Sequence, residues 1–140
     1  MADSKDMVIL TQTYDLLTWL LPHCERFPKS QRFVVTQRLQ GALLDFQEAL
    51  FDANARAGAQ RLEYLQTADA HLNKLRLYLR LARQWSWLGS GQYQHASGLV
   101  AEIGRLLGGW IKTTRAQAAG GPVRRGGPAG REGGGGQRRA

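Results

Sequence analysis

The sequence predicts an all-α protein, an antiparallel up-down-up-down four-helix bundle followed by a disordered basic tail. Three observations support this fold class. Apolar residues recur at intervals of three and four over four long segments, which is the period of amphipathic helices. No segment alternates apolar and polar residues for long enough to form a strand. After residue 112 the composition changes to glycine, proline and arginine up to Ala140.

The first helix is expected to begin at Ser4, a suitable N-cap, and to reach Leu21. Its apolar stripe contains Leu10, Tyr14, Leu17 and Leu21, widened by Ile9, Leu16 and Leu20. Pro22 either ends this helix or kinks it for one further turn, because proline lacks the N–H donor that a helix needs. A linker over residues 23–28 then reverses the chain.

The second and third helices are separated by a short break near Gly58, where glycine offers a C-terminal stop. We expect Ser30 to be the N-cap of the second helix, and we expect the third helix to run to about Trp87. The apolar stripe of the second helix is Phe33, Leu39, Ala42, Leu43, Phe46, Ala49, Leu50 and Ala53. The stripe of the third is Leu62, Leu65, Ala68, Leu72, Leu75, Leu79 and Ala82.

The fourth helix follows a turn at residues 89–91, with Ser90 as its expected N-cap, and ends near Lys112. Its apolar stripe is Tyr93, Ala96, Val100, Ile103, Leu107 and Trp110. Because short connections join long helices, consecutive helices are expected to be antiparallel neighbours. Residues 1–112 therefore form the bundle, and residues 113–140 form the tail.

The helices contain more apolar residues than one small bundle needs, which favours association with other copies. The surplus residues are Trp19, Leu77, Tyr78, Leu81, Trp85, Trp87, Leu88, Leu99 and Leu106. Glycines inside the last helix, at positions 98, 104, 108 and 109, each cost roughly 1 kcal/mol relative to alanine unless a close backbone approach compensates. We expect an oligomer. The alternative is a single bundle in which the surplus apolar residues pack at the edges between its own helices.

The chain has a formal net charge of +8 that is unevenly distributed. Residues 1–112 hold 13 Lys and Arg against 10 Asp and Glu, a net +3. Residues 113–140 hold six arginines against one glutamate, a net +5. Such a basic chain favours polyanionic partners, nucleic acid first. The alternative is a solvated basic surface without a partner.

Cysteine usage and the N-terminus point to the cytoplasm. Cys24 is the only cysteine, so neither an intrachain disulfide nor a cysteine-based metal cluster can form. The first residues do not resemble a signal peptide, because Asp3 and Asp6 flank Lys5. No stretch is apolar enough to span a bilayer. We expect a cytoplasmic protein without a membrane partner.

The sequence contains no catalytic or metal-binding constellation. None of His23, His71 and His95 has a Cys, Asp or Glu at the spacing that a metal site on a helix needs. No glycine-rich phosphate loop precedes a helix, because the glycines gather after the last one. We therefore expect a protein that is not an enzyme and that needs no cofactor or metal.

The basic residues form two clusters in the bundle. Arg76, Arg80 and Arg83 recur at i, i+4 and i+7, which places a row of guanidinium groups on one face of the third helix. Guanidinium groups match phosphate oxygens, and neighbouring aromatic rings can stack on unpaired bases. The alternative is a solvated face whose aromatic residues belong to the core. The second cluster, at the start of the second helix, is Arg26, Lys29, Arg32 and Arg38.

The tail has almost no residue that could be buried, and we expect it to be disordered. An Arg-Gly-Gly sequence begins at Arg125, directly after Arg124, and such segments bind nucleic acid through charge with little sequence preference. Lys112, directly before this tail, is a further candidate contact for nucleic acid. The alternative is a solubilising extension without a binding function.

Four segments of the chain resemble one known family. They are YDLLTWLLPH (residues 14–23), FPKSQRF (27–33), LRLYLRLA (75–82) and EIGRLLGGWI (102–111). Together they resemble the accessory variability determinant (Avd) proteins of diversity-generating retroelements. The chain is more distantly similar to the four-helix-bundle proteins encoded in 23S rRNA intervening sequences. The resemblance covers residues 14–112.

This resemblance implies a homopentameric barrel that binds RNA or DNA and the reverse transcriptase of the same element, in support of mutagenic retrohoming. The family's basic positions on the third helix correspond to Arg76 and Arg80, and its glycine-tryptophan packing positions to Gly104, Gly108 and Trp110. Two classes of function stay open. One is a nucleic-acid-binding accessory of a reverse transcriptase, and the other is an oligomeric interaction protein whose charge is incidental.

Overall fold

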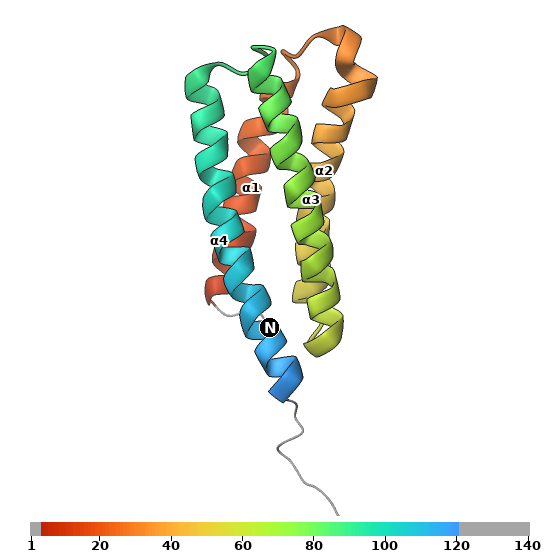
Figure 1. Ribbon diagram of the computed structural model, residues 1–140, viewed down its shortest axis with the longest axis vertical. Helices are drawn as coiled ribbons and strands as arrows, with labels where there is room; N and C mark the ends of the chain where they lie inside the picture. The colour runs from red at the N-terminus through yellow and green to blue at the C-terminus, as the bar shows by residue number, and fades with distance from the viewer. Residues whose placement is uncertain (1–3, 121–140) are drawn as a thin grey trace, which may run out of the picture.

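The computed structural model describes residues 4–120, which fold into four long α-helices packed side by side (Figure 1). The helices are α1 (Ser4–Cys24), α2 (Gln37–Asn54), α3 (Gly58–Gln84) and α4 (Ser90–Gly120). A 3-10 turn, η1 (Lys29–Gln31), and a π-helical turn, η2 (Arg32–Thr36), precede α2. No strand occurs within the described range. The prediction of an all-α protein with four helices is confirmed.

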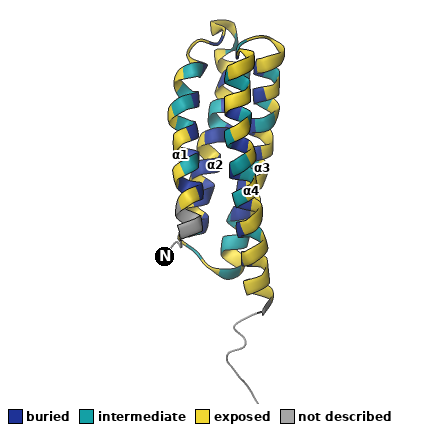
Figure 2. Ribbon diagram, turned by 90° about the vertical axis from the view of Figure 1, so that its left-hand side faces the viewer, coloured by how far each residue is buried: buried dark blue, intermediate teal, exposed yellow. Residues whose placement is uncertain are grey.

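Each helix packs against two others, α2 against α1 and α3, and α4 against α3 and α1. Figure 1 shows each helix running along the long axis of the molecule, with the connections at its two ends. The buried faces point toward the common centre and the exposed faces point outward (Figure 2). The predicted stripes of α2, α3 and α4 are buried at Leu39, Ala42, Leu43, Phe46, Ala49, Leu50, Ala53, Leu65, Ala68, Leu72, Leu75, Leu79, Ala82, Ala96, Val100, Ile103, Leu107 and Trp110.

The predicted stripe of α1 is confirmed at Ile9, Leu10, Leu16 and Leu20, but its centre lies one position earlier than predicted. The buried face runs through Ile9, Thr13, Leu16, Leu20 and Cys24, whereas Tyr14 is 62% exposed. Thr13 can lie in the core because its hydroxyl donates to the Ile9 carbonyl oxygen at 2.8 Å. Thr13 is polar, so the apolar pattern of the sequence breaks at this position although the buried face continues through it.

The α1 helix continues through Pro22 to Cys24, so the proline does not end the helix. The next prediction, an N-cap at Ser30, is wrong. Pro28 has the extended backbone geometry φ −55°, ψ 133°, and the chain re-enters helical geometry through η1 and η2 before α2 begins. Phe33, which was expected in the core, is 77% exposed because the wider π turn changes which side chains face inward.

The α3 helix ends at Gln84, three residues before the expected end at Trp87, in a Schellman motif. The Trp87 N–H donates to the Ala82 carbonyl at 2.8 Å, and the Ser86 N–H donates to the Arg83 carbonyl at 3.1 Å. Ser86 takes the left-handed conformation that this motif requires, with φ 63°. A serine therefore fills the position that more often holds glycine.

Both ends of α4 differ from the prediction. The helix includes Ser90 as its first residue, and the Gln92 side-chain oxygen accepts a hydrogen bond from the Gly89 N–H at 2.8 Å, in the manner of half a capping box. At the other end the helix passes the expected boundary at Lys112 and reaches Gly120. Thr114 lies in that extension and is buried, so the bundle does not end at residue 112. Residues 121–140 of the expected tail lie outside the described residues.

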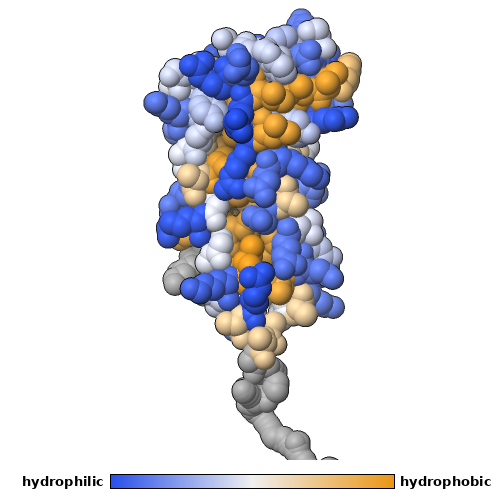
Figure 3. Space-filling view, in the orientation of Figure 1, coloured by the Kyte–Doolittle hydropathy of each residue, from blue (hydrophilic) through white to orange (hydrophobic). Residues whose placement is uncertain are grey.

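Most of the surplus apolar residues pack inside the bundle rather than on its surface. Leu88 is fully buried, and Trp19, Tyr78, Leu81, Trp87, Leu99 and Leu106 are half-buried. Only Leu77 and Trp85 of that set are exposed. The other large exposed apolar residues are Val8, Tyr14, Phe33, Val34, Leu44 and Phe51. Apolar surface therefore gathers on α1, η2 and α2, and Figure 3 shows a hydrophobic area at the end of the bundle where η2 lies.

Candidate nucleic-acid interface

Arg76 and Arg80 line a groove between α3 and α4. This α3–α4 groove has a volume of about 260 Å³ and is lined by Arg76, Leu79, Arg80, Tyr93, Ser97, Val100 and Ala101. Its floor is apolar, because Leu79 and Val100 belong to the core. The two guanidinium groups stand one helical turn apart, so the groove presents a pair of positive charges above a hydrophobic floor.

Arg76 is held in place by contacts from both helices. Its Nη1 donates to Asn73 Oδ1 at 2.7 Å, one turn earlier on α3. Its other terminal nitrogen lies over Gly104 of α4, in the space that a Cβ atom would need. Gly104 therefore makes room for the arginine, and the guanidinium group is oriented before any ligand arrives.

Negative charge does not compete strongly for these arginines. No Asp or Glu occurs on the chain between Asp69 and Glu102. Glu102 is engaged by Arg105, which donates to it from Nε at 2.9 Å. This hydrogen bond lowers the pKa of Glu102, so the carboxylate is ionised and already paired at neutral pH.

The third member of the predicted row, Arg83, is exposed in the last turn of α3 and does not line the groove. Next to it, an aromatic series runs from the core to the surface. The ring centroids of Phe27 and Trp87 are 5.4 Å apart, and those of Trp87 and Trp85 are 5.2 Å apart. Trp85 is exposed at the outer end of this series. It offers a ring face on which an unpaired base can stack.

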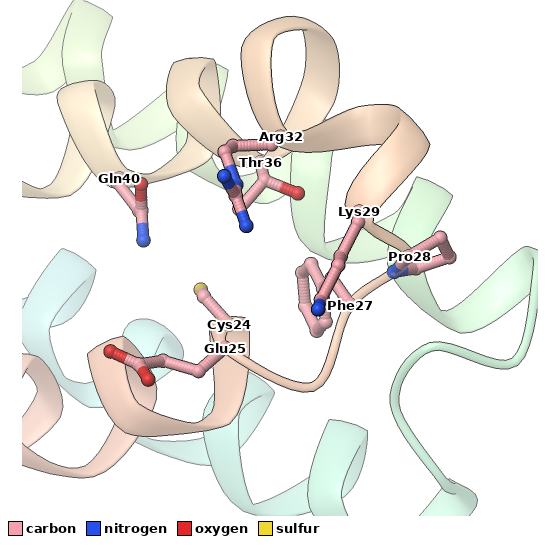
Figure 4. A pocket seen from close by; sticks show the side chains of 8 residues that line it. All are labelled: Cys24, Glu25, Phe27, Pro28, Lys29, Arg32, Thr36 and Gln40. Carbon is pink, nitrogen blue, oxygen red and sulfur yellow. The ribbon is translucent and has the colours of Figure 1, made fainter.

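Two residues of the second basic cluster meet around a separate pocket (Figure 4). This end pocket has a volume of about 340 Å³ and is lined by Cys24, Glu25, Phe27, Pro28, Lys29, Arg32, Thr36 and Gln40. Lys29 and Arg32 are part of it, whereas Arg38 is exposed on α2 and does not line it. The structure therefore brings together Lys29 and Arg32 but not Arg38.

Lys112 is not gathered with these groups. Lys112 is exposed in the last third of α4, toward the opposite end of the bundle from η2 (Figure 1). Arg124 and Arg125 lie outside the described residues. Among residues 4–120, Lys112 therefore lies far along the bundle from Lys29 and Arg32.

Two of the predicted packing residues, Trp110 and Gly104, make contacts within the chain. Trp110 is buried in the core, and the Arg61 guanidinium carbon lies 5.7 Å from the centroid of its ring. Gly104 accommodates the side chain of Arg76. Gly108 differs from both, because a Cβ atom at this position would meet nothing within 4 Å.

Few features of the sequence indicate the residues that position these cations. Asn73 and Ser97 were missed around the α3–α4 groove, and Thr36 and Gln40 were missed in the end pocket. Only Asn73 had a usable signal, since it stands three residues before Arg76 on a helix. Over the part of the chain that the structure describes, no group of three His, Cys, Asp or Glu side chains could hold a metal ion. No helix in that part is long and apolar enough to span a membrane.

Comparison with known proteins identifies the family. The family model described as bAvd-like matches residues 7–114. No curated protein matches the chain. A solved structure of a protein of unknown function from the S23 ribosomal protein family of Bacteroides thetaiotaomicron has a TM-score of 0.71 to this chain at 19% sequence identity. The match covers 77% of this chain and 98% of that one, and at such low identity it shows a shared fold. The resemblance found in the sequence is thereby confirmed, and the chain belongs to the bAvd-like family.

Proposed function

We propose that this protein is a non-enzymatic, cytoplasmic accessory of a diversity-generating retroelement. In this role it binds nucleic acid and the element's reverse transcriptase and supports mutagenic retrohoming. The observation that carries the proposal is the α3–α4 groove, in which Asn73 and Gly104 orient Arg76 beside Arg80. Membership of the bAvd-like family supplies the retroelement context.

The arginine pair suits the backbone of a nucleic acid. A guanidinium group binds phosphate and carboxylate equally well with two parallel hydrogen bonds, but phosphates recur along a strand, so neighbouring guanidinium groups can each bind one. Apart from the two arginines, only Ser97 and Tyr93 line the groove with polar side chains, so few groups there could read a base edge. We therefore expect binding that depends strongly on salt and little on sequence.

The proposal includes assembly into a homopentameric barrel of up-down-up-down protomers. Exposed apolar side chains on α1 and α2, including Tyr14, Leu44 and Phe51, supply surface that a neighbouring copy can bury. Five copies would place ten groove arginines on one particle, which raises the effective concentration near a polyanion. Light scattering on the full chain measures this state directly. A monomer at micromolar concentration would refute the assembly while leaving the groove intact.

A second candidate function is an oligomeric interaction protein without a nucleic-acid role. The exposed apolar surface on α1, η2 and α2 favours this candidate, because such surface binds proteins rather than phosphates. The two candidates predict different behaviour of the groove variants.

Fluorescence anisotropy with a labelled single-stranded RNA separates the candidates. The test protein is the Arg76→Ala/Arg80→Ala variant, and the matched control is Lys74→Ala/Arg115→Ala. The control removes the same charge from exposed positions on α3 and α4 that do not line the groove. The accessory role predicts that the groove variant binds much more weakly than the control. Equal binding by the two variants would favour the interaction protein.

A further inference from the structure

The end pocket contains an unusual polar group. Thr36 is 6% exposed, and its Oγ1 atom has no hydrogen-bond partner although it is buried. A buried hydroxyl without a partner is destabilising, because it no longer has its hydrogen bonds to water. Thr36 lines the end pocket, so a ligand that displaces the side chains covering this hydroxyl can supply the missing partner.

The π-helical turn explains why Thr36 lacks its ordinary partner. Thr13 and Thr67 donate to the carbonyl four residues earlier, at 2.8 Å and 3.1 Å. In η2, the corresponding carbonyl of Arg32 accepts from the Gln37 N–H, five residues later, and the Thr36 hydroxyl does not bond to it. Single π turns in helical proteins are often found at functional sites.

The same turn aligns the donors of the pocket. Arg32, Thr36 and Gln40 are spaced four residues apart, and all three line the pocket. Figure 4 shows the Arg32 and Gln40 side chains pointing into the space between η2 and the end of α1, with the Lys29 ammonium group reaching in from the side. Guanidinium, ammonium, hydroxyl and amide groups are the donors that hold a tetrahedral oxyanion.

The walls of the pocket leave it with a net positive charge. Phe27 is buried and forms an apolar wall with Pro28. Burial raises the pKa of the Cys24 thiol to about 12, so this group is neutral at physiological pH. Glu25 also lines the pocket, and its carboxylate lies on the opposite side from Lys29 (Figure 4). Two cations against one carboxylate favour an anion.

We propose that the end pocket is a binding site for a phosphate group, held by Lys29, Arg32, Gln40 and the hydroxyl of Thr36. Its volume of about 340 Å³ lies at the small end of the range for ligand sites, which suits a phosphate ester rather than a large cofactor. The phosphate comes either from a free small ester or from the end of a nucleic-acid strand. The site is separate from the α3–α4 groove and does not rest on the proposed function.

Isothermal titration of the full chain with inorganic phosphate, at constant ionic strength, tests the site. Arg32→Ala should weaken phosphate binding about ten-fold or more, as expected for removal of a charge-assisted hydrogen bond. Thr36→Val keeps the size of the side chain and removes the hydroxyl, and it should weaken binding several-fold. Thr36→Ser should restore it. Arg38→Ala removes the same charge outside the pocket. It should bind phosphate like the parent.

The midpoint of thermal unfolding shows whether a variant that binds phosphate weakly is still folded. Thr36→Val should not lower it, because the substitution removes a buried polar atom that has no partner. The absence of saturable phosphate binding by the parent would overturn the proposal. Equal binding by the parent, Arg32→Ala and Thr36→Val would overturn it as well.

The source of the phosphate is found by comparing two otherwise identical oligonucleotides. Tighter binding of the 5′-phosphorylated form than of the 5′-hydroxyl form, abolished in Arg32→Ala, supports a strand end as the ligand. Equal binding of the two forms, with inorganic phosphate still bound, supports a free small ester. Removal of the groove arginines should weaken both oligonucleotides by the same factor, so the preference for the 5′-phosphorylated form should stay as in the parent.

Discussion

The Gly104→Ala substitution should displace the Arg76 guanidinium group without removing it. A Cβ atom at this position would lie 3.6 Å from Leu72 Cδ2, which is an ordinary van der Waals distance, but it would collide with a terminal nitrogen of Arg76. The end of an arginine side chain is flexible, so the guanidinium group should move and the helices should not. Within the chain, the hydrogen bond from Arg76 to Asn73 is the interaction that this movement would break.

The two effects of this substitution on stability have opposite signs. Replacing glycine by alanine inside a helix stabilises it by about 1 kcal/mol, and breaking an exposed hydrogen bond costs about half of that. The variant should therefore be as stable as the parent or slightly more stable. Binding should weaken, because Arg76 no longer reaches its phosphate, and the slope of log affinity against log salt should fall by about 0.7 for single-stranded RNA.

Fluorescence anisotropy over a salt series measures this change, with thermal unfolding measured alongside. Gly108→Ala is the matched control, because a Cβ atom there meets nothing within 4 Å. The control should gain the same helical stability and keep the parent salt slope. Adding Gly104→Ala to Arg76→Ala should have no further effect on binding. An unchanged salt slope in Gly104→Ala, or a decrease in stability above about 2 kcal/mol, would refute the role given to Gly104.

Two further predictions concern the stability of the bundle. A chain that ends after Lys112 should unfold at a lower temperature than one that ends after Gly120, because it lacks the last part of α4 and the buried Thr114. Equal melting temperatures would show that the bundle ends at residue 112. Burial raises the pKa of the Cys24 thiol from 9.0 to about 12, so between these pH values the unfolded chain releases a proton that the folded chain keeps. The contribution of this thiol to the free energy of unfolding should be constant below pH 9 and should fall by about 1 kcal/mol per pH unit above it. Urea unfolding of the parent and of Cys24→Ala measures the difference between their pH slopes. Equal slopes would show that the thiol is freely exposed.

The sequence predicted the helices well because their stripes reflect one physical cause, the burial of one face of each helix. The prediction failed where a polar residue is buried or an apolar residue is exposed. Thr13 is buried because its hydroxyl is satisfied locally, and Phe33 is exposed because the π turn changes the helical phase. Neither a π turn nor a serine in the left-handed conformation, as at Ser86, has a pattern that distinguishes it in a single sequence.

The candidate sites were predictable only in part, for a similar reason. The spacing of Arg76 and Arg80 placed both on one face of a helix, and the structure places both in one groove. The role of Gly104 depends on how α4 packs against α3, which no spacing within α4 reveals. Glycine in a helix was interpreted as a site of packing between copies, whereas at position 104 it accommodates a side chain of the same copy.

The salt dependence of RNA binding by Arg76→Ala/Arg80→Ala tests the central claim most directly. If both arginines contact phosphates, the slope of log affinity against log salt should fall by about 1.4 relative to the parent, at unchanged thermal stability. The Lys74→Ala/Arg115→Ala control should keep most of the parent slope. A groove variant with the same slope and affinity as this control would contradict the assignment of the α3–α4 groove to nucleic acid.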